Sequence, residues 1–146
     1  MKRISKSLEE TGEMARKFAQ GLKKSEKATV VALIGDLGSG KTAFSQAVGN
    51  FLGVKETMQS PTFVIEKIYP IDYQGFKNLI HIDAYRLEKE SELVHLGWEE
   101  IIKEPENLIL IEWPERVQAI IPNHTHKVFF EHLNENTRVI NYENQD

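Results

Sequence analysis

The stretch Gly35-Asp36-Leu37-Gly38-Ser39-Gly40-Lys41-Thr42 fits the phosphate-binding loop pattern, in which two glycines are separated by four residues and followed by Lys and a hydroxyl residue. Such a loop brings several backbone N–H groups onto one triphosphate, so it needs tight turns and positions without a Cβ atom. The glycines at 35, 38 and 40 meet that need. In this pattern the Lys reaches the β- and γ-phosphates and the Thr hydroxyl binds Mg²⁺.

The residues on either side of this loop have the patterns of a strand and a helix. Residues 29–34, Thr-Val-Val-Ala-Leu-Ile, are typical of a strand buried on both faces. After the loop, apolar residues recur at helical spacing until Gly53: Phe44, Ala47, Val48, Phe51 and Leu52. The N-terminus of that helix adds its dipole to the anion site. A glycine-rich turn that binds nothing is the alternative interpretation, and the order of strand, loop and helix disfavours it.

Composition indicates an ordinary globular protein. The chain has 146 residues, of which 40% are hydrophobic and 27% charged, so we expect one domain over residues 1–146. A net charge of −4 disfavours a wide nucleic-acid surface. The absence of cysteine excludes disulfides and thiol chemistry. No window approaches the length of a membrane span, and we expect a cytoplasmic protein with no membrane partner.

Before the loop, Ser7 and Glu10 form a capping-box pattern that predicts the start of a helix. Residues 11, 14, 15, 18 and 22 share one face, and the helix is expected to end near Lys23-Lys24. Packing on a sheet is the favoured role of this helix.

After the loop's helix, the segment Ser60-Pro61-Thr62-Phe63 has two interpretations, a strand-entry turn or a loop that senses the γ-phosphate. Residues 63–69 and 78–83 have strand patterns, and the linker 70–76 is too short for a crossover helix. We therefore predict that these two strands pair antiparallel, which makes the sheet mixed.

Two acidic residues follow apolar strand patterns. Asp83 ends the run 78–83, where it is either a turn residue or a Mg²⁺ ligand. Glu112 ends the run 107–112 before Trp113 and Pro114. An acid directly after buried strand residues is costly unless it faces a positive charge, which Mg²⁺ would provide. Trp113 is expected either over this site or in the core.

The remaining segments predict structural elements. Residues 88–104 read as two short helices that meet at Gly97, with Trp98 in the core or against a partner. Residues 127–133 and 138–142 flank a turn and predict a hairpin. The histidines at 124, 126 and 132 lack further ligand residues, so we interpret them as surface residues rather than a metal site.

Four motifs occur in order at spacings that resemble those of the bacterial TsaE family. They are the loop 35–42, Ser60-Pro-Thr-Phe63, His81-Ile-Asp-Ala-Tyr-Arg-Leu87 and Glu112-Trp113. The resemblance covers essentially the whole chain. It implies an α/β single-domain P-loop NTPase with a mixed parallel and antiparallel sheet flanked by helices, which binds ATP or ADP with Mg²⁺. It also implies action with the TsaD and TsaB proteins in making threonylcarbamoyladenosine at position 37 of tRNAs that read codons starting with A, with tRNA engaged through that complex.

The resemblance assigns roles residue by residue. Lys41, Asp83 and Glu112 are the implied catalytic residues, and Thr42, Asp83 and Glu112 the implied metal ligands, with the two acids able to exchange roles. Thr62 falls in the switch-like segment, which favours the nucleotide-sensing interpretation. The implied nucleotide-binding residues are Thr11, Gly35, Asp36, Leu37, Gly38, Ser39, Gly40, Lys41, Thr42, Ala43, Thr62 and Arg138.

Three functions remain open from the sequence. The first is a Mg²⁺-dependent ATPase, weak without partners, whose hydrolysis drives or resets a tRNA-modification complex; Arg86 is the nearest candidate arginine finger by motif. The second is a small-molecule kinase, which the absence of an arginine cluster disfavours. The third is a nucleotide sensor that does not hydrolyse. The absence of an Asn-Lys-x-Asp motif disfavours GTP.

Overall fold

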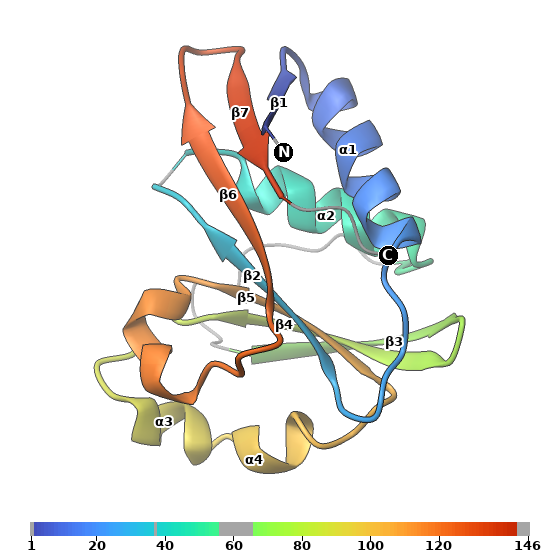
Figure 1. The fold of residues 1–146 in the computed structure, drawn as a ribbon, viewed down its shortest axis with the longest axis vertical. Coiled ribbons are helices and arrows are strands. Elements are labelled where there is room, and N and C mark those ends of the chain that lie inside the picture. Colours follow the sequence, from blue (N-terminus) through green and yellow to red (C-terminus); the bar gives the residue numbers. More distant parts are fainter. Residues whose placement is uncertain (1, 37, 56–65, 143–146) are drawn as a thin grey trace.

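The computed structural model describes residues 2–36, 38–55 and 66–142, which form one seven-stranded sheet with helices on both faces (Figure 1). The strands are β1 (Lys2–Ser5), β2 (Thr29–Ile34), β3 (Glu66–Tyr73), β4 (Phe76–Asp83), β5 (Asn107–Glu112), β6 (His126–His132) and β7 (Arg138–Asn141). The helices are α1 (Leu8–Gln20), α2 (Lys41–Phe51), α3 (Glu90–Val94), α4 (Trp98–Ile101) and the 3₁₀ segment η1 (Pro114–Ile120).

The sheet is mixed, as predicted, with the strand order β1-β7-β6-β2-β5-β4-β3. The four central strands are parallel neighbours, and the pairs at both edges are antiparallel. Because β2, β5 and β4 are parallel, their carboxyl ends meet at one edge of the sheet, where open α/β sheets place their ligands. All six residues of β5 are buried, as expected for a central strand.

Two hydrophobic cores lie on opposite faces of the sheet. One lies between the sheet and the pair α1 and α2, and includes Phe18, Phe44 and Leu110. The other lies between the sheet and α3, α4 and η1, and includes Trp98, Ile82 and Ile111. Trp98 is 1% exposed and its indole N–H donates to the Ile120 carbonyl, which confirms its expected place in the core.

The structure corrects two boundaries and adds one strand. The helix α1 starts after the N-cap Ser7 as predicted but ends at Gln20, not near Lys23-Lys24, because the chain turns at Gly21. The strand β3 extends to Tyr73 and includes Pro70, which an edge strand tolerates; the turn is only Gln74-Gly75. The strand β1 was not anticipated, since four residues carry too little pattern to identify a strand.

The other secondary-structure predictions are confirmed. Two short helices meet at Gly97, whose φ of 88° is accessible to glycine. The strands β6 and β7 form the predicted hairpin. His124 and His132 are exposed and His126 is half-buried. Among the described residues no cluster of three or more His, Asp or Glu could hold a metal ion. Burial, together with neighbouring His124, lowers the pKa of His126.

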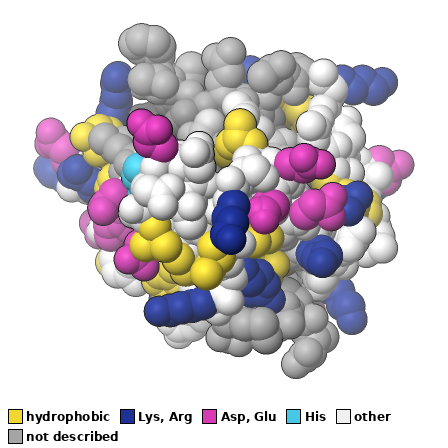
Figure 2. Space-filling model, turned by 90° about the horizontal axis from the view of Figure 1, so that it is seen from above, with side chains coloured by type: hydrophobic (Ala, Val, Ile, Leu, Met, Phe, Trp, Pro, Cys, Tyr) yellow, Lys and Arg dark blue, Asp and Glu magenta, His cyan; other side chains and the backbone are white. Residues whose placement is uncertain are grey.

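The described helices are all too short or too polar to cross a membrane. The face shown in Figure 2 carries Lys and Arg side chains interspersed with Asp and Glu, so it has no large area of one charge. This distribution agrees with the net charge of −4 and does not favour a wide nucleic-acid contact on that face.

Candidate functional site

The glycine loop connects β2 to α2, as the sequence predicts. Gly38 and Gly40 have φ values of 76° and 108°, which favour glycine, and Gly40 is the N-cap of α2. Because Gly40 has no side chain to cap the helix, its first N–H groups are left for another acceptor. An anion at this end of α2 would supply that acceptor.

Gly35 needs to be glycine for a different reason, the close packing of the loop against β6. A Cβ atom built there would lie 2.7 Å from the Phe130 carbonyl oxygen and 2.9 Å from the Phe130 Cβ. Backbone on β6 cannot move aside as a flexible side chain can. The loop therefore depends on this position for its attachment to the sheet.

We expect Gly35→Ala to destabilise the protein by about 1–3 kcal/mol, as overpacking does elsewhere. The matched control is Gly12→Ala in α1, where the nearest atom to a new Cβ is 4.0 Å away. That variant should stabilise the fold by about 0.5–1 kcal/mol, because alanine is the better helix former. Urea unfolding measures both values, and a Gly35→Ala protein as stable as the wild type would contradict the packing account.

Lys41 lies buried at the start of α2, with 5% of its surface exposed. Its ammonium donates a hydrogen bond to the Gly35 carbonyl and lies 3.6 Å from the centre of the Trp113 ring. Burial lowers the pKa of Lys41, while the nearby carboxylates, with Glu112 contributing most, act to raise it. The side chain is therefore already drawn into the loop next to the acids.

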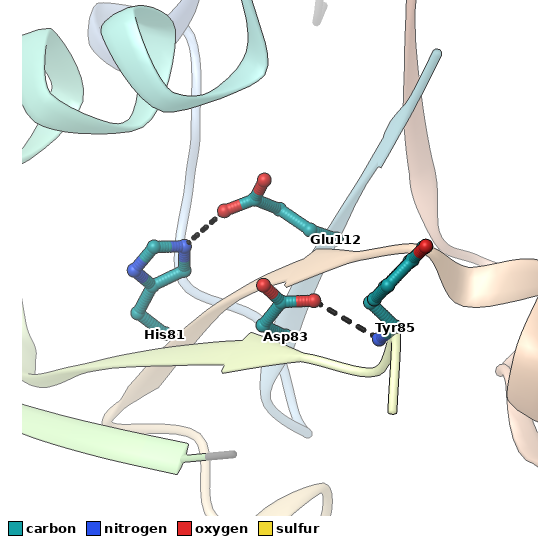
Figure 3. A network of polar contacts seen from close by, with 4 residues as sticks. All are labelled: His81, Asp83, Tyr85 and Glu112. Carbon is teal, nitrogen blue, oxygen red and sulfur yellow. Dashed lines mark hydrogen bonds and ion pairs between the residues drawn. The ribbon is translucent and has the colours of Figure 1, made fainter. Parts of the chain in front are cut away.

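The two acids end neighbouring parallel strands at the same level. Asp83 of β4 is the register partner of Glu112 of β5, and Glu112 is in turn the partner of Leu33 near the end of β2. The Asp83 carboxylate accepts a hydrogen bond of 3.0 Å from the Tyr85 N–H, and Glu112 accepts one of 2.7 Å from His81 (Figure 3). The sequence prediction that both acids follow strands is confirmed, and their adjacency brings two carboxylates beside the glycine loop.

A cavity of about 660 Å³ joins these parts. Of the residues predicted from the sequence it is lined by Thr11, Gly38, Gly40, Lys41, Thr42, Ala43, Asp83, Glu112 and Arg138. Gly35, Asp36 and Ser39 belong to the loop but are not among the lining residues; Asp36 is exposed and Ser39 is buried. Leu37 and the Ser60–Phe63 segment, with Thr62, lie outside the described residues.

The cavity is also lined by the start of α1 and by the β6–β7 turn. Thr11 is 3% exposed and its hydroxyl is hydrogen-bonded to that of Ser5 at 2.7 Å, which ties α1 to β1. The Arg138 guanidinium donates to the carbonyls of Asn134 and Glu135. The Arg138 side chain also passes close to Gly40: a Cβ atom built at Gly40 would lie 3.4 Å from the Arg138 Cδ. Residues far apart in the sequence thus enclose the loop.

Sequence reasoning did not assign several other lining residues: Ser7, Leu8, Tyr85, Glu135 and Asn136. Ser7 was predicted only as a helix cap, and nothing in its local pattern shows that the capped end faces a cavity. Arg86, the candidate finger, and Trp113 also line the cavity. Trp113 lies beside Tyr85, with ring centres 5.0 Å apart, and its ring centre is 3.6 Å from the Lys41 ammonium. It therefore contacts the site as one prediction had it, and it also packs against the core on that face of the sheet. The H-x-D-x-Y-R motif could have pointed to Tyr85, since it stands two residues after Asp83.

The structure is thus an α/β protein in which a loop with the phosphate-binding pattern lies between a buried strand and a helix, with acids at the ends of the next two strands of the sheet. Residues 5–140 match the family model described as threonylcarbamoyl adenosine biosynthesis protein TsaE. The chain belongs to the TsaE family.

Individual relatives agree with this assignment. The chain is 38% identical over 132 residues to the tRNA threonylcarbamoyladenosine biosynthesis protein TsaE of Rickettsia felis, covering 90% of this chain and 72% of that protein. It is 34% identical over 113 residues to the Bacillus subtilis protein of the same name, covering 77% and 68%. The crystal structure of Bacillus subtilis YdiB superposes with a TM-score of 0.76 at 26% identity and covers 100% of this chain and 86% of that chain.

Proposed function

We propose that this protein is a Mg²⁺-dependent ATPase that supports the TsaD–TsaB complex in the threonylcarbamoylation of adenosine 37 of tRNA. The observation that carries the proposal is that Lys41, Thr42 and the acids Asp83 and Glu112 line one and the same cavity. These are the parts that phosphoryl transfer to water requires: a cation for phosphate, a hydroxyl for the metal and carboxylates for metal and water. The pathway comes from the names of the relatives, and we expect the protein to act in the cytoplasm.

The residues present fit a nucleotide with its metal. The uncapped N-terminus of α2 supplies N–H groups, and Gly38 has open space at its missing Cβ, so a phosphate can approach the backbone. The Ser39 hydroxyl is buried without a hydrogen-bond partner among the described residues. Mg²⁺ commonly needs only one or two protein ligands besides phosphates and water, so the lack of a three-ligand cluster among the described residues is compatible with it.

Within this proposal each residue has a role. Lys41 turns from the Gly35 carbonyl toward the β- and γ-phosphates and offsets their charge. Thr42 and Glu112 would hold Mg²⁺, since Glu112 ends the strand next to β2 and is the acid that most strongly affects Lys41. Bound Mg²⁺ would neutralise charge on the phosphate oxygens. Asp83, one strand further away, orients the attacking water.

Other residues of the cavity suit the nucleoside. Thr11 and Arg138, with the β6–β7 turn, also line the cavity and would give the base and ribose a polar surround. Arg86 also lines the cavity and is the candidate for a finger in cis. If a partner supplies another, the chain alone is a weak ATPase. We propose that tRNA engages the complex rather than this chain's own surface.

The experiment is ATP hydrolysis by the chain alone and with TsaD and TsaB, measured with γ-labelled ATP. We expect label to appear as inorganic phosphate and the rate to rise when both partners are present. Transfer of label to a metabolite would identify a kinase instead. Binding of ATP without a single turnover in the assembled complex would identify a nucleotide sensor, and either result would overturn the proposal.

A further inference from the structure

His81 is a fully buried residue beside the acids. Neither the proposed nucleotide binding nor core packing accounts for a histidine at this position. It is on β4, two residues before Asp83, and has 1% of its surface exposed. Its strand-register neighbours are Leu110 of β5 and Lys67 of β3. The preceding residue on the same face, Leu79, is a core side chain, so an apolar residue would be the ordinary choice here.

His81 contacts Glu112 through one ring nitrogen. The distance from Nε2 to the Glu112 Oε2 is 2.7 Å, and both side chains are almost wholly buried. A carboxylate only accepts hydrogen bonds, so Nε2 carries the proton and donates. Water does not compete for a contact at this depth, which makes the hydrogen bond stronger and its geometry more constant than at a surface.

The other ring nitrogen brings the fold no benefit. Nδ1 of His81 is buried without a hydrogen-bond partner among the described residues. Burying a polar atom unpaired costs stability, so packing alone does not account for a histidine at this position. The contact with Glu112 is what distinguishes His81 from an apolar residue.

We infer that His81 is a positioning residue, which fixes the Glu112 carboxylate so that its second oxygen faces the cavity. Figure 3 shows one Glu112 oxygen directed at the His81 ring and the other directed away from it. Glutamate has one more rotatable bond than the aspartate usual at such a site, and a buried donor on one oxygen removes that freedom. Partners of this kind commonly change metal affinity or activity by about 10- to 100-fold when they are removed.

The different lengths of the Gln and Asn side chains provide a matched test of the His81–Glu112 hydrogen bond. In glutamine the amide nitrogen is as many bonds from Cα as Nε2 is in histidine, whereas in asparagine it is one bond closer, at the level of Nδ1. His81→Gln can therefore still donate to Glu112, and His81→Asn cannot reach it. His81→Leu fills the space with no donor at all.

The inference rests on the proposed function for its kinetic readout. With TsaD and TsaB present, we expect His81→Asn and His81→Leu to lower kcat by about 10- to 100-fold with KM for ATP within about 3-fold, and His81→Gln to keep kcat within about 3-fold of the wild type. Wild-type rates for the Asn and Leu variants, or a loss in Gln as large as that in Leu, would overturn it.

A binding measurement separates this inference from the proposed function. A fluorescent ADP analogue is titrated with and without Mg²⁺, and urea unfolding confirms that each variant is folded. We expect Mg²⁺ to tighten ADP binding by the wild type and by His81→Gln. For His81→Asn and His81→Leu, we expect the same tightening to require an Mg²⁺ concentration about 10-fold higher. If the wild type binds in this way yet hydrolyses no ATP, only the proposed function fails; equal Mg²⁺ dependence in all four proteins overturns the inference.

Discussion

Lys41→Ala is expected to lose nucleotide binding, with the affinity for ATP falling by about 100-fold or more. The ammonium would make at least two charge-assisted hydrogen bonds to the phosphates, each contributing about 1.5–3 kcal/mol. At about 1.4 kcal/mol for each factor of ten, their loss gives an effect of this size. Titration of a fluorescent ATP analogue measures it directly.

The change must be separated from an effect on folding. Lys41 is buried among carboxylates, so its removal also alters the charge balance of Glu112 and Asp83. Lys41→Met fills the same space without the charge and should lose binding to the same degree. Lys103→Ala removes an exposed lysine and should bind as the wild type does. Normal ATP affinity in both folded Lys41 variants would refute the assigned role.

Replacement of Glu112 should leave binding intact and remove turnover. We expect Glu112→Ala to bind ATP within about 3-fold of the wild type and to hydrolyse it at least about 100-fold more slowly with partners present, since groups that act on the reacting proton or metal contribute about 10²–10⁴-fold. The reason is that the phosphate contacts come from the loop and Lys41, while Glu112 acts on the metal. Single-turnover hydrolysis alongside equilibrium binding resolves the two effects.

Two further variants control this experiment. Glu112→Ala leaves the buried His81 Nε2 without an acceptor, which costs about 1–3 kcal/mol of stability. Glu112→Gln retains an acceptor for His81 but lacks the charge, so it should lose turnover at a smaller cost in stability. Glu115→Gln removes another acid that acts on Lys41 but is exposed, and should keep turnover. Turnover at the wild-type rate in Glu112→Gln would exclude the assigned role.

Much of the fold could be predicted because the patterns that determine it are local. The run before Gly35 is buried on both sides, and the spacing from Phe44 to Leu52 fits a helix. The short linker 70–76 correctly predicts an antiparallel pair, although its first residues, including Pro70, belong to β3. The strand β1 carries no such signal, because its four residues are ordered by pairing with β7.

The site could be predicted only where a motif marks it. Lys41, Thr42 and the two acids belong to recognisable patterns, and the structure brings them together. Ser7 and Glu135 line the same cavity because the start of α1 and the β6–β7 turn converge on it, which is a tertiary arrangement with no local signature. The contact between His81 and Glu112 joins residues 31 apart and depends on the register of β4 against β5.

The central claim is that ATP turnover by this chain allows the TsaD–TsaB complex to act repeatedly. The most direct test counts threonylcarbamoyladenosine formed per complex when TsaD and TsaB, with excess tRNA and threonylcarbamoyl donor, receive either the wild-type chain or Glu112→Gln. The account predicts many rounds with the wild type and no more than a single round with the variant. Repeated rounds at the wild-type rate with Glu112→Gln would contradict it.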